Sequence, residues 1–293
     1  MILVTTPTGD IGARVLHRVL EVGELVRVVA RRASSLPEAL AGRIDVVEGS
    51  HADAAVIGRA LAGVDRVFWL PPGSPDSPGP EAAYVNFSRA FARALPDSDV
   101  THVVGVSALG RGWPKPSGHA AASVRMDDLI AASRVSYRAL ACASLMDNIA
   151  RQAGPIRETG TFYAPTPGNL ELPHVAKSDV AAVAARLLLS PDWQGAEDVA
   201  LRGSEDLSFD AMATIMSEAL GRSVTFRAMS MEDFAGMMRS MGTSEGMAEA
   251  YVEMLTAKNE GMDATGGPGR RADTPTRFGQ WCEDELRPIV GLR

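Results

Sequence analysis

The beginning of the chain constrains its fold most, because a short apolar run leads into a turn with two glycines and then into an amphipathic segment. The apolar run is 2–5, the glycines are Gly9 and Gly12, and apolar residues recur at helical spacing from Ile11 to Leu20. A second apolar run at 25–30 stands where the next parallel strand of a β-α-β unit belongs. A helix that begins at such a turn offers free N–H groups and the positive end of its dipole to a pyrophosphate. The sequence therefore predicts a dinucleotide-binding loop, with a tight turn that holds no ligand as the alternative.

The loop departs from the usual glycine pattern at its first position, where Thr6 stands before Pro7. A residue before proline favours extended backbone, whereas a glycine at this position lets the chain turn tightly. We therefore expect an altered loop. Thr6 remains part of it, but the cofactor is held mainly by the second half of the loop, made of Thr8, Gly9, Asp10, Ile11 and Gly12.

Strand and helix patterns alternate through the first half of the chain, which predicts an α/β fold with a doubly wound parallel sheet. The predicted strands are 2–5, 25–30, 43–48, 65–70, 100–106 and 136–141. The predicted helices between them are 11–20, 54–61, 81–95 and 119–133. A loop rich in proline, glycine and serine, 71–80, follows the fourth strand, and such sheets bind ligands at this edge. Leu70 and Pro71, at the end of that strand, are therefore candidate cofactor contacts.

Composition excludes several classes of partner. The chain has 293 residues, a net charge of −7 and no basic block, which argues against nucleic acid and anionic membranes. It enters its first strand directly, no apolar run reaches membrane-spanning length, and its two cysteines are far apart in the sequence. The histidines and cysteines show no zinc spacing, so no metal is implied. We expect a cytoplasmic protein that acts on a small molecule, and a homodimer is left open.

The end of the second strand bears on the choice of cofactor. Enzymes that use NAD place an acidic residue there for the ribose diol, whereas this chain has Arg31 and Arg32. Guanidinium groups bind phosphate through forked hydrogen bonds, so the pair favours the 2′-phosphate of NADP(H). The alternative is two solvated arginines on a loop.

Ser107 and His119 are the candidate catalytic residues. Ser107 is expected just after the fifth strand, where it also contacts the cofactor, and His119 at the start of the next helix. A serine hydroxyl can bind a carbonyl oxygen and a histidine can exchange a proton near neutral pH. For His119 a cap or surface position is the alternative. The surrounding sequence 105–110 is not the nucleophile elbow of a serine hydrolase.

Seven segments, in this order along the chain, resemble the NmrA-like members of the atypical short-chain dehydrogenases and reductases. They are 2–12, 62–70, 103–109, 156–162, 178–182, 207–210 and 219–222. The resemblance implies a Rossmann domain, 1–150, and a smaller, mostly helical substrate-binding lobe, 151–293, of which 178–201 returns to pack on the Rossmann core. It also implies a nicotinamide dinucleotide, NAD(P)H, as cofactor, but leaves open whether the protein is a reductase or a regulator that senses the dinucleotide.

The chain departs from this family's patterns in two places. The family usually has Arg-Pro-Gly after the sixth strand, where this chain has Cys142, Ala143 and Ser144. We therefore expect Cys142 and Ser144 to form an altered cofactor wall near the nicotinamide. A standard short-chain reductase also needs a lysine four residues after its tyrosine, and none of the four tyrosines has one. A carbonyl reductase of the Tyr/Lys type is disfavoured.

Two function classes follow. The first is an NADP(H)-dependent enzyme that acts on a fairly large, aromatic or quinone-like compound. Its role would be the tailoring of a secondary metabolite, such as a polyketide. It includes the variant in which coupling or rearrangement occurs without net redox change. The second is a non-catalytic NADP(H)-sensing regulator, which alone would need a protein partner. A methionine-rich stretch, 231–254, is expected to cover the substrate cleft, with ordinary helix packing as the alternative.

Overall fold

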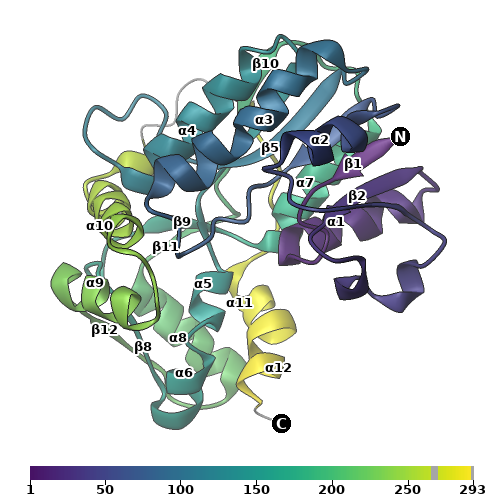
Figure 1. Ribbon diagram of the computed structural model, residues 1–293. Coiled ribbons are helices and arrows are strands. Elements are labelled where there is room, and N and C mark those ends of the chain that lie inside the picture. The colour runs from purple at the N-terminus through teal and green to yellow at the C-terminus, as the bar shows by residue number, and fades with distance from the viewer. Residues whose placement is uncertain (265–269, 292–293) are drawn as a thin grey trace.

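A single parallel sheet of eight strands organises the computed structural model, which describes residues 1–264 and 270–291 (Figure 1). Its strands lie in the order β13-β10-β6-β5-β4-β1-β2-β3. Their bounds are β1 Ile2–Val4, β2 Val26–Ala30, β3 Asp45–Glu48, β4 Arg66–Trp69, β5 His102–Ala108, β6 Ser136–Cys142, β10 Ala196–Leu201 and β13 Arg270–Arg271. The chain order reverses beside β1, which pairs with β2 on one side and β4 on the other. Ligands bind at such a switch point in open α/β sheets.

Helices cover both faces of this sheet, and each face has its own apolar core. On one face lie α1 (Asp10–Glu21) and α7 (Lys177–Leu189), which pack against each other and contribute Val15 and Val180 to the apolar core of this face. The other face carries α2 (Ala54–Leu61), the π-helical turn η3 (Glu81–Asn86), α3 (Phe87–Ala94) and α4 (Gly118–Ala131). There Trp69 of β4 stacks on Phe91 of α3 at a ring separation of 4.0 Å. The predicted fold class is confirmed.

The element bounds differ from prediction by a few residues, and one difference matters for the site. Ser107 was expected in the loop after the fifth strand, but β5 continues through Ala108 and pairs with β6 along its whole length. Short 3₁₀ turns connect other elements: η1 Ala33–Ser35, η2 Glu38–Leu40, η4 Leu95–Asp97 and η5 Met262–Ala264. Ser107 is therefore held in the sheet by its pairing with Ala141 of β6.

The rest of the chain forms a lobe at the carboxyl edge of the sheet (Figure 1). Its strands are β7 Ser144–Leu145, β8 Thr161–Ala164, β9 Leu172–Val175, β11 Asp206–Leu207 and β12 Thr225–Ala228, which form a three-stranded and a two-stranded sheet. Its helices are α5 Asp147–Ala150, α6 Ala153–Thr159, α8 Phe209–Leu220, α9 Met231–Ser240, α10 Glu245–Asn259, α11 Phe278–Trp281, the π-helical η6 Cys282–Leu286 and α12 Arg287–Val290. Phe162, Met216 and Trp281 lie at its apolar centre.

Part of the second half of the chain returns to the large sheet. The helix α7 packs on α1, and β10 extends the sheet beside β6. The glycine content of 263–271 predicts a mobile stretch, but residues 265–269 lie outside the described part of the chain. Among the described residues, none of the helices has both the length and the apolar character needed to cross a membrane.

Candidate active site

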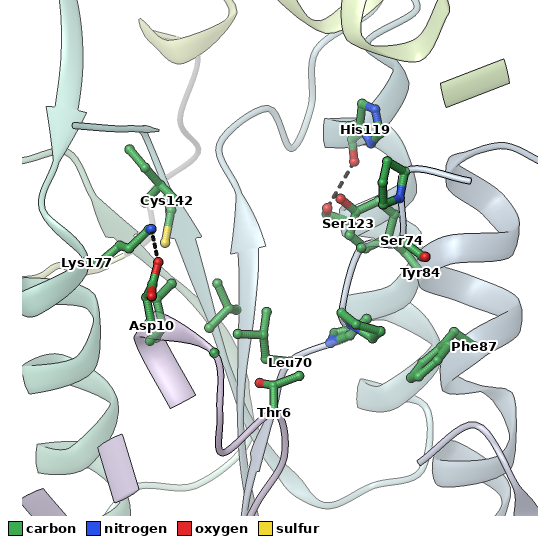
Figure 2. A pocket seen from close by; sticks show the side chains of 18 of the residues that line it. Thr6, Asp10, Leu70, Ser74, Tyr84, Phe87, His119, Ser123, Cys142 and Lys177 are labelled. Atoms are coloured by element: carbon green, nitrogen blue, oxygen red, sulfur yellow. Dashed lines mark hydrogen bonds and ion pairs between the residues drawn. The ribbon is translucent and has the colours of Figure 1, made fainter. Parts of the chain in front are cut away.

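A cavity of about 960 Å³ opens at the switch point, where the carboxyl ends of β1, β2, β4, β5 and β6 meet. Its walls come from the first glycine loop, the 71–80 loop, α4, the segment after β6, and α10 of the lobe. Figure 2 shows this pocket with Asp10, Lys177 and Cys142 on one side and Tyr84, Ser123 and His119 on the other. The predicted site residues that line it are, in chain order, Thr6, Thr8, Gly9, Asp10, Ile11, Arg31, Arg32, Leu70, Pro71, Ser107, His119, Cys142 and Ser144.

 

Counted together, fourteen residues were predicted for the site. Thirteen of them line the cavity, and Gly12 lies directly behind the loop. The sequence therefore placed these residues at one cavity, although their separate roles stay predictions.

The first glycine loop corrects one expectation. Thr6 was expected to be extended because it precedes a proline, but its φ is +49°, in the left-handed region that a first glycine normally occupies. The turn is closed by the Gly9 N–H, which donates to the Thr6 carbonyl at 3.0 Å, and the Thr6 hydroxyl donates to the Thr5 carbonyl at 2.8 Å. These bonds hold Thr6 in the conformation that the tight turn requires.

Gly12 lets α1 approach this turn. A Cβ at Gly12 would lie 2.1 Å from the Thr6 carbonyl oxygen, so only glycine fits. Gly9 stands at the N-cap, and among the described residues no side chain caps the helix. The first N–H groups of α1 therefore remain available for an anion at the cavity wall. This backbone cradle fits the pyrophosphate of a dinucleotide.

Lys177 enters the same end of the cavity from the first turn of α7. Its ammonium group lies 2.5 Å from the Asp10 carboxylate and 3.5 Å from that of Asp147, and Figure 2 shows the Asp10 contact. The hydrogen bond from Lys177 lowers the pKa of Asp10. The pair thus offsets the negative charge that Asp10 places beside the dinucleotide loop.

The predicted phosphate contacts follow β2, the strand that pairs with β1 and so lies beside the glycine loop. Arg31 and Arg32 are exposed and line the cavity after β2. His51 lies nearby, and its Nε2 donates to the Leu70 carbonyl at 3.3 Å, because a carbonyl oxygen only accepts. Burial lowers the pKa of His51 to about 4, so the ring is neutral at pH 7 and its Nδ1 is an acceptor. Two cations and one acceptor therefore stand where the adenosine half of NADP(H) would lie.

Ser107 joins the cavity to a buried carboxyl group. Its hydroxyl lies 2.5 Å from Oδ2 of Asp127, and the Tyr137 hydroxyl donates to Oδ1 of the same carboxyl group at 2.6 Å. Asp127 is 2% exposed, and this burial raises its pKa to about 7. Burial also raises the pKa of Tyr137 well above its usual value, so Tyr137 remains a hydroxyl donor.

His119 lines the cavity at the start of α4, as expected. Its hydrogen bonding, however, leaves the ring able to accept a hydrogen bond from the cavity but not to donate a proton to it. Its Nε2 donates to the Met247 carbonyl at 3.2 Å, and its buried Nδ1 has no partner among the described residues. Burial lowers the pKa of His119. The neutral ring offers an acceptor and no spare proton, so delivery of a proton by His119 stays a prediction without support from this geometry.

Aromatic rings surround His119 and form the wall of the cavity away from the dinucleotide loop. Tyr84 of η3 meets the His119 ring edge-on at 5.9 Å, and Tyr251 of α10 lies 4.0 Å from it. Met254 and Lys258 follow Tyr251 at helical spacing and also line the cavity. We call Tyr84, His119, Tyr251 and Met254 the aromatic wall.

The lobe therefore covers the cavity with one helix, and the prediction for the methionines is wrong in part. Of the eight methionines in 229–262, all of them in the described part of the chain, Met254 alone lines the cavity. Met247 is fully buried, and Met241 of the α9–α10 connection is 68% exposed. The sequence pattern located the lobe that covers the cavity, but Tyr251 provides its aromatic surface.

Backbone contacts fix α10 in this place. A Cβ at Gly246 would lie 2.2 Å from the Pro78 carbonyl oxygen, and the Ser244 N–H donates to the Pro75 carbonyl at 2.9 Å. On the other side, a Cβ at Gly118 of α4 would lie 2.0 Å from the Ala250 carbonyl oxygen. The 71–80 loop, α4 and α10 are therefore in direct backbone contact around the cavity.

Sequence reasoning missed Lys177, His51, Tyr84, Tyr251 and Asp127. One signal pointed to Asp127, because His119, Ser123 and Asp127 are spaced four apart and so share one face of a helix that is otherwise rich in alanine. Ser123 donates to the His119 carbonyl at 3.0 Å. The tyrosines gave no local signal, since their contacts join segments far apart in the sequence.

Comparison with models of known protein families identifies the family to which this chain is similar. A family model described as NAD(P)H-binding matches residues 7–191, more than half of the chain. The match confirms NAD(P)H as the predicted class of cofactor. The span begins in the glycine loop and ends just after α7, so it covers most of the dinucleotide half of the cavity.

Two curated relatives match over most of their length. The NAD(P)H azoreductase of Xenophilus azovorans is 28% identical over 254 residues, which cover 87% of this chain and 86% of the relative. The (4-alkanoyl-5-oxo-2,5-dihydrofuran-3-yl)methyl phosphate reductase of Streptomyces griseus is 29% identical over 266 residues, which cover 90% of this chain and 89% of the relative. Both relatives are reductases by name.

Two solved structures share the fold. The triphenylmethane reductase of Citrobacter sp. complexed with NADP(H) has a TM-score of 0.79 at 19% identity, covering 96% of this chain and 98% of that one. The NADPH-dependent quinone oxidoreductase of Escherichia coli complexed with NADPH has a TM-score of 0.76 at 20% identity, covering 99% and 95%. The whole chain, lobe included, therefore has the architecture of these proteins.

Proposed function

Because the chain belongs to the NAD(P)H-binding family, we propose that it is an NADPH-dependent reductase that acts on an electron-poor aromatic or quinone-like compound. Within this family we place it in the NmrA-like branch on the motifs described above. The observation that carries the proposal is the single cavity, which joins the dinucleotide loop at one end to the aromatic wall at the other. A cofactor and a flat substrate can therefore meet inside it.

The names of the relatives support this class of substrate. They include an azoreductase, a quinone oxidoreductase and a triphenylmethane reductase. Azo compounds, quinones and cationic triphenylmethane dyes all accept a hydride into a conjugated system. Such acceptors do not require the Tyr/Lys pair that activates an isolated carbonyl, and this chain lacks that pair.

In the proposed enzyme, different residues of the cavity bind the cofactor and the substrate. The N–H groups of α1 would hold the pyrophosphate, and Arg31 and Arg32 would hold the 2′-phosphate. When bound, NADPH supplies the hydride. Tyr251 and Met254 would pack on the substrate ring, and Ser107 would face its oxygen or nitrogen. The large sheet thus binds the cofactor, while the lobe supplies the substrate wall.

Turnover of NADPH with three probes tests the proposal. The probes are a naphthoquinone, a neutral azo dye and a cationic triphenylmethane dye, each followed by the loss of NADPH absorbance. We expect turnover with at least one probe, and Tyr251→Ala should raise KM for it. Tyr163→Ala is the matched control, because Tyr163 is an exposed tyrosine outside the cavity lining.

Tight binding of NADPH without turnover of any probe would contradict the proposed reductase and favour the sensing regulator. Chemical conversion of a probe without loss of NADPH absorbance would instead favour the variant with no net redox change. A role in polyketide tailoring and a cytoplasmic location stay predictions.

A further inference from the structure

We propose that Asp127 stores the proton for reduction and passes it through the Ser107 hydroxyl to the substrate in the cavity. The inference rests on the proposed reductase function and adds Asp127 and Tyr137, which belong neither to the predicted cofactor contacts nor to the aromatic wall. Three side chains form the proposed path: Ser107 at the cavity wall, Asp127 behind it, and Tyr137 behind Asp127.

The carboxyl group of Asp127 is connected to the cavity only through Ser107. Asp127 and Tyr137 are each 2% exposed, and neither lines the cavity, whereas Ser107 does. The two oxygens of Asp127 are each used once, Oδ2 by Ser107 at 2.5 Å and Oδ1 by Tyr137 at 2.6 Å. A proton that leaves Asp127 for the cavity must therefore pass through the Ser107 hydroxyl.

The charged and titratable groups around Asp127 keep it close to half protonated at neutral pH. Burial is the largest effect and raises the pKa of Asp127 to about 7, Asp198 of β10 raises it further, and the hydroxyls of Ser107 and Tyr137 and the charge of Arg111 lower it. Cys142 of β6 also faces this region, but burial raises its pKa to about 12, so it stays an uncharged thiol. Arg111 is itself shared between Asp198 and Asp128.

The charge of Asp127 decides what Ser107 offers to the cavity. When Asp127 is ionised, both neighbouring hydroxyls donate to the carboxylate, and Ser107 presents only lone pairs to a substrate. When Asp127 is protonated, it donates to Ser107, and the Ser107 hydrogen is free to point into the cavity. The protonated state alone makes Ser107 a donor to an oxygen or nitrogen that gains charge.

The protons and electrons of quinone reduction balance when the proton follows this path. The quinone ring gains one hydride, which NADPH supplies, and becomes a hydroquinone anion. That oxygen takes the proton of Ser107, and Ser107 takes the proton of Asp127, which remains as a carboxylate that accepts from Ser107 and Tyr137. Water in the emptied cavity returns a proton through Ser107 after the product leaves. A cationic triphenylmethane dye needs no proton, because the hydride alone gives the neutral product.

This difference between substrates gives the test. We expect Asp127→Asn to lower kcat for naphthoquinone by roughly a hundredfold, because general acid help is of that size, and to leave kcat for the cationic dye within about twofold. Dye reduction also reports that the variant is folded and binds NADPH. Asp128→Asn is the matched control, since Asp128 is the next residue of α4, lies at the surface and contacts Arg111 instead of Ser107.

The pH profile separates a proton path from a merely structural role. With quinone, kcat of the wild-type protein should fall as pH rises through about 7, since Asp127 is then losing the required proton. Tyr137→Phe removes a donor that stabilises the carboxylate, so it should move this fall to higher pH. With the cationic dye, kcat should not follow this titration.

Infrared spectra of the cofactor-free protein supply a readout that does not depend on activity. A protonated carboxyl band should be present below about pH 7, should disappear at higher pH, and should be missing in Asp127→Asn but present in Asp128→Asn. Absence of this band in the wild-type protein, or equal losses with quinone and dye in Asp127→Asn, would overturn the proton path. If the wild-type protein reduces neither probe, the proposed function fails and the path fails with it.

Discussion

The ammonium group of Lys177 lies 2.5 Å from the carboxylate of Asp10, and this contact joins the first turn of α7 to the first turn of α1. The two residues are 167 positions apart in the sequence. Lys177 is largely buried, with a side-chain exposure of 14%, whereas that of Asp10 is 70%. A cation from the second half of the chain thus stands beside the predicted pyrophosphate site.

Removal of that cation should weaken cofactor binding. In Lys177→Met the Asp10 carboxylate keeps its charge beside the pyrophosphate, so we expect NADPH affinity to fall about tenfold, or about 1.4 kcal/mol. The double variant Lys177→Met with Asp10→Asn should regain most of the affinity. Calorimetry at low and high salt measures both, and the loss should be smaller at high salt because screening weakens the repulsion. Unchanged affinity in Lys177→Met would show that Asp10 lies away from the bound phosphates.

A methyl group at Gly12 should disrupt the cofactor loop. The Cβ of Gly12→Ala would lie 2.1 Å from the Thr6 carbonyl oxygen, so the turn and α1 must move apart. We expect loss of NADPH binding in calorimetry and a lower free energy of unfolding in urea. Gly58→Ala is the matched control, because a Cβ at Gly58 in α2 meets nothing within 4 Å. That variant should bind NADPH normally and gain about 0.5–1 kcal/mol from better helix propensity.

The two arginines after β2 should set the preference for NADPH over NADH. A charge-assisted hydrogen bond is worth roughly 1.5–3 kcal/mol, so Arg31→Ala with Arg32→Ala should weaken NADPH binding by about tenfold or more. NADH binding should change little, because NADH lacks the 2′-phosphate. Arg43→Ala, an exposed arginine that does not line the cavity, is the control. A preference for NADPH that survives the double change would assign the phosphate to other residues.

Two buried histidines should make the protein less stable in mild acid. Burial lowers the pKa of His51 and of His174 to about 4 in the folded chain, below the ordinary value of 6.5. The unfolded chain therefore binds these protons first, and stability is lost as pH falls from about 6.5 towards 4. Each histidine should remove about 2 kcal/mol at about pH 5.

Urea unfolding at about pH 7 and about pH 5 measures this loss. His174→Gln should shrink the difference between the two pH values by about 2 kcal/mol, and the double variant with His51→Gln by about twice as much. Asp127 acts in the opposite direction, because its raised pKa makes the folded chain lose stability as pH rises towards 7. A pH dependence that is the same in His174→Gln would show that this ring is protonated in the folded protein.

The fold could be predicted because its signals are local. Apolar runs at strand spacing, helical stripes and the glycine turn are each contained within about a dozen residues, and they place the sheet and its carboxyl edge. The conformation of Thr6 could not be predicted this way. A residue before proline prefers extended backbone, but the hydrogen bonds of this turn and its close contact with Gly12 outweigh that preference. These contacts form only in the folded loop.

The site could be predicted on its cofactor side and less on its substrate side. Glycine and arginine positions follow from the strand ends that precede them, so Gly9 and Arg31 were found. Tyr84 and Tyr251 belong to helices 167 residues apart, and only the packing of α10 on α4 and the 71–80 loop brings them together. No periodicity within either helix contains that information.

The order of the strands in the large sheet has a consequence for synthesis of the chain. The strand β6 ends at Cys142, but its neighbour β10 begins only at Ala196, after α5 to β9 of the lobe have been made. During translation one edge of β6 therefore stays unpaired until more than fifty further residues have left the ribosome. An unpaired strand edge can form hydrogen bonds with other chains and so promote aggregation. Slow elongation or a shortage of chaperones should reduce the yield of folded protein most strongly in this interval.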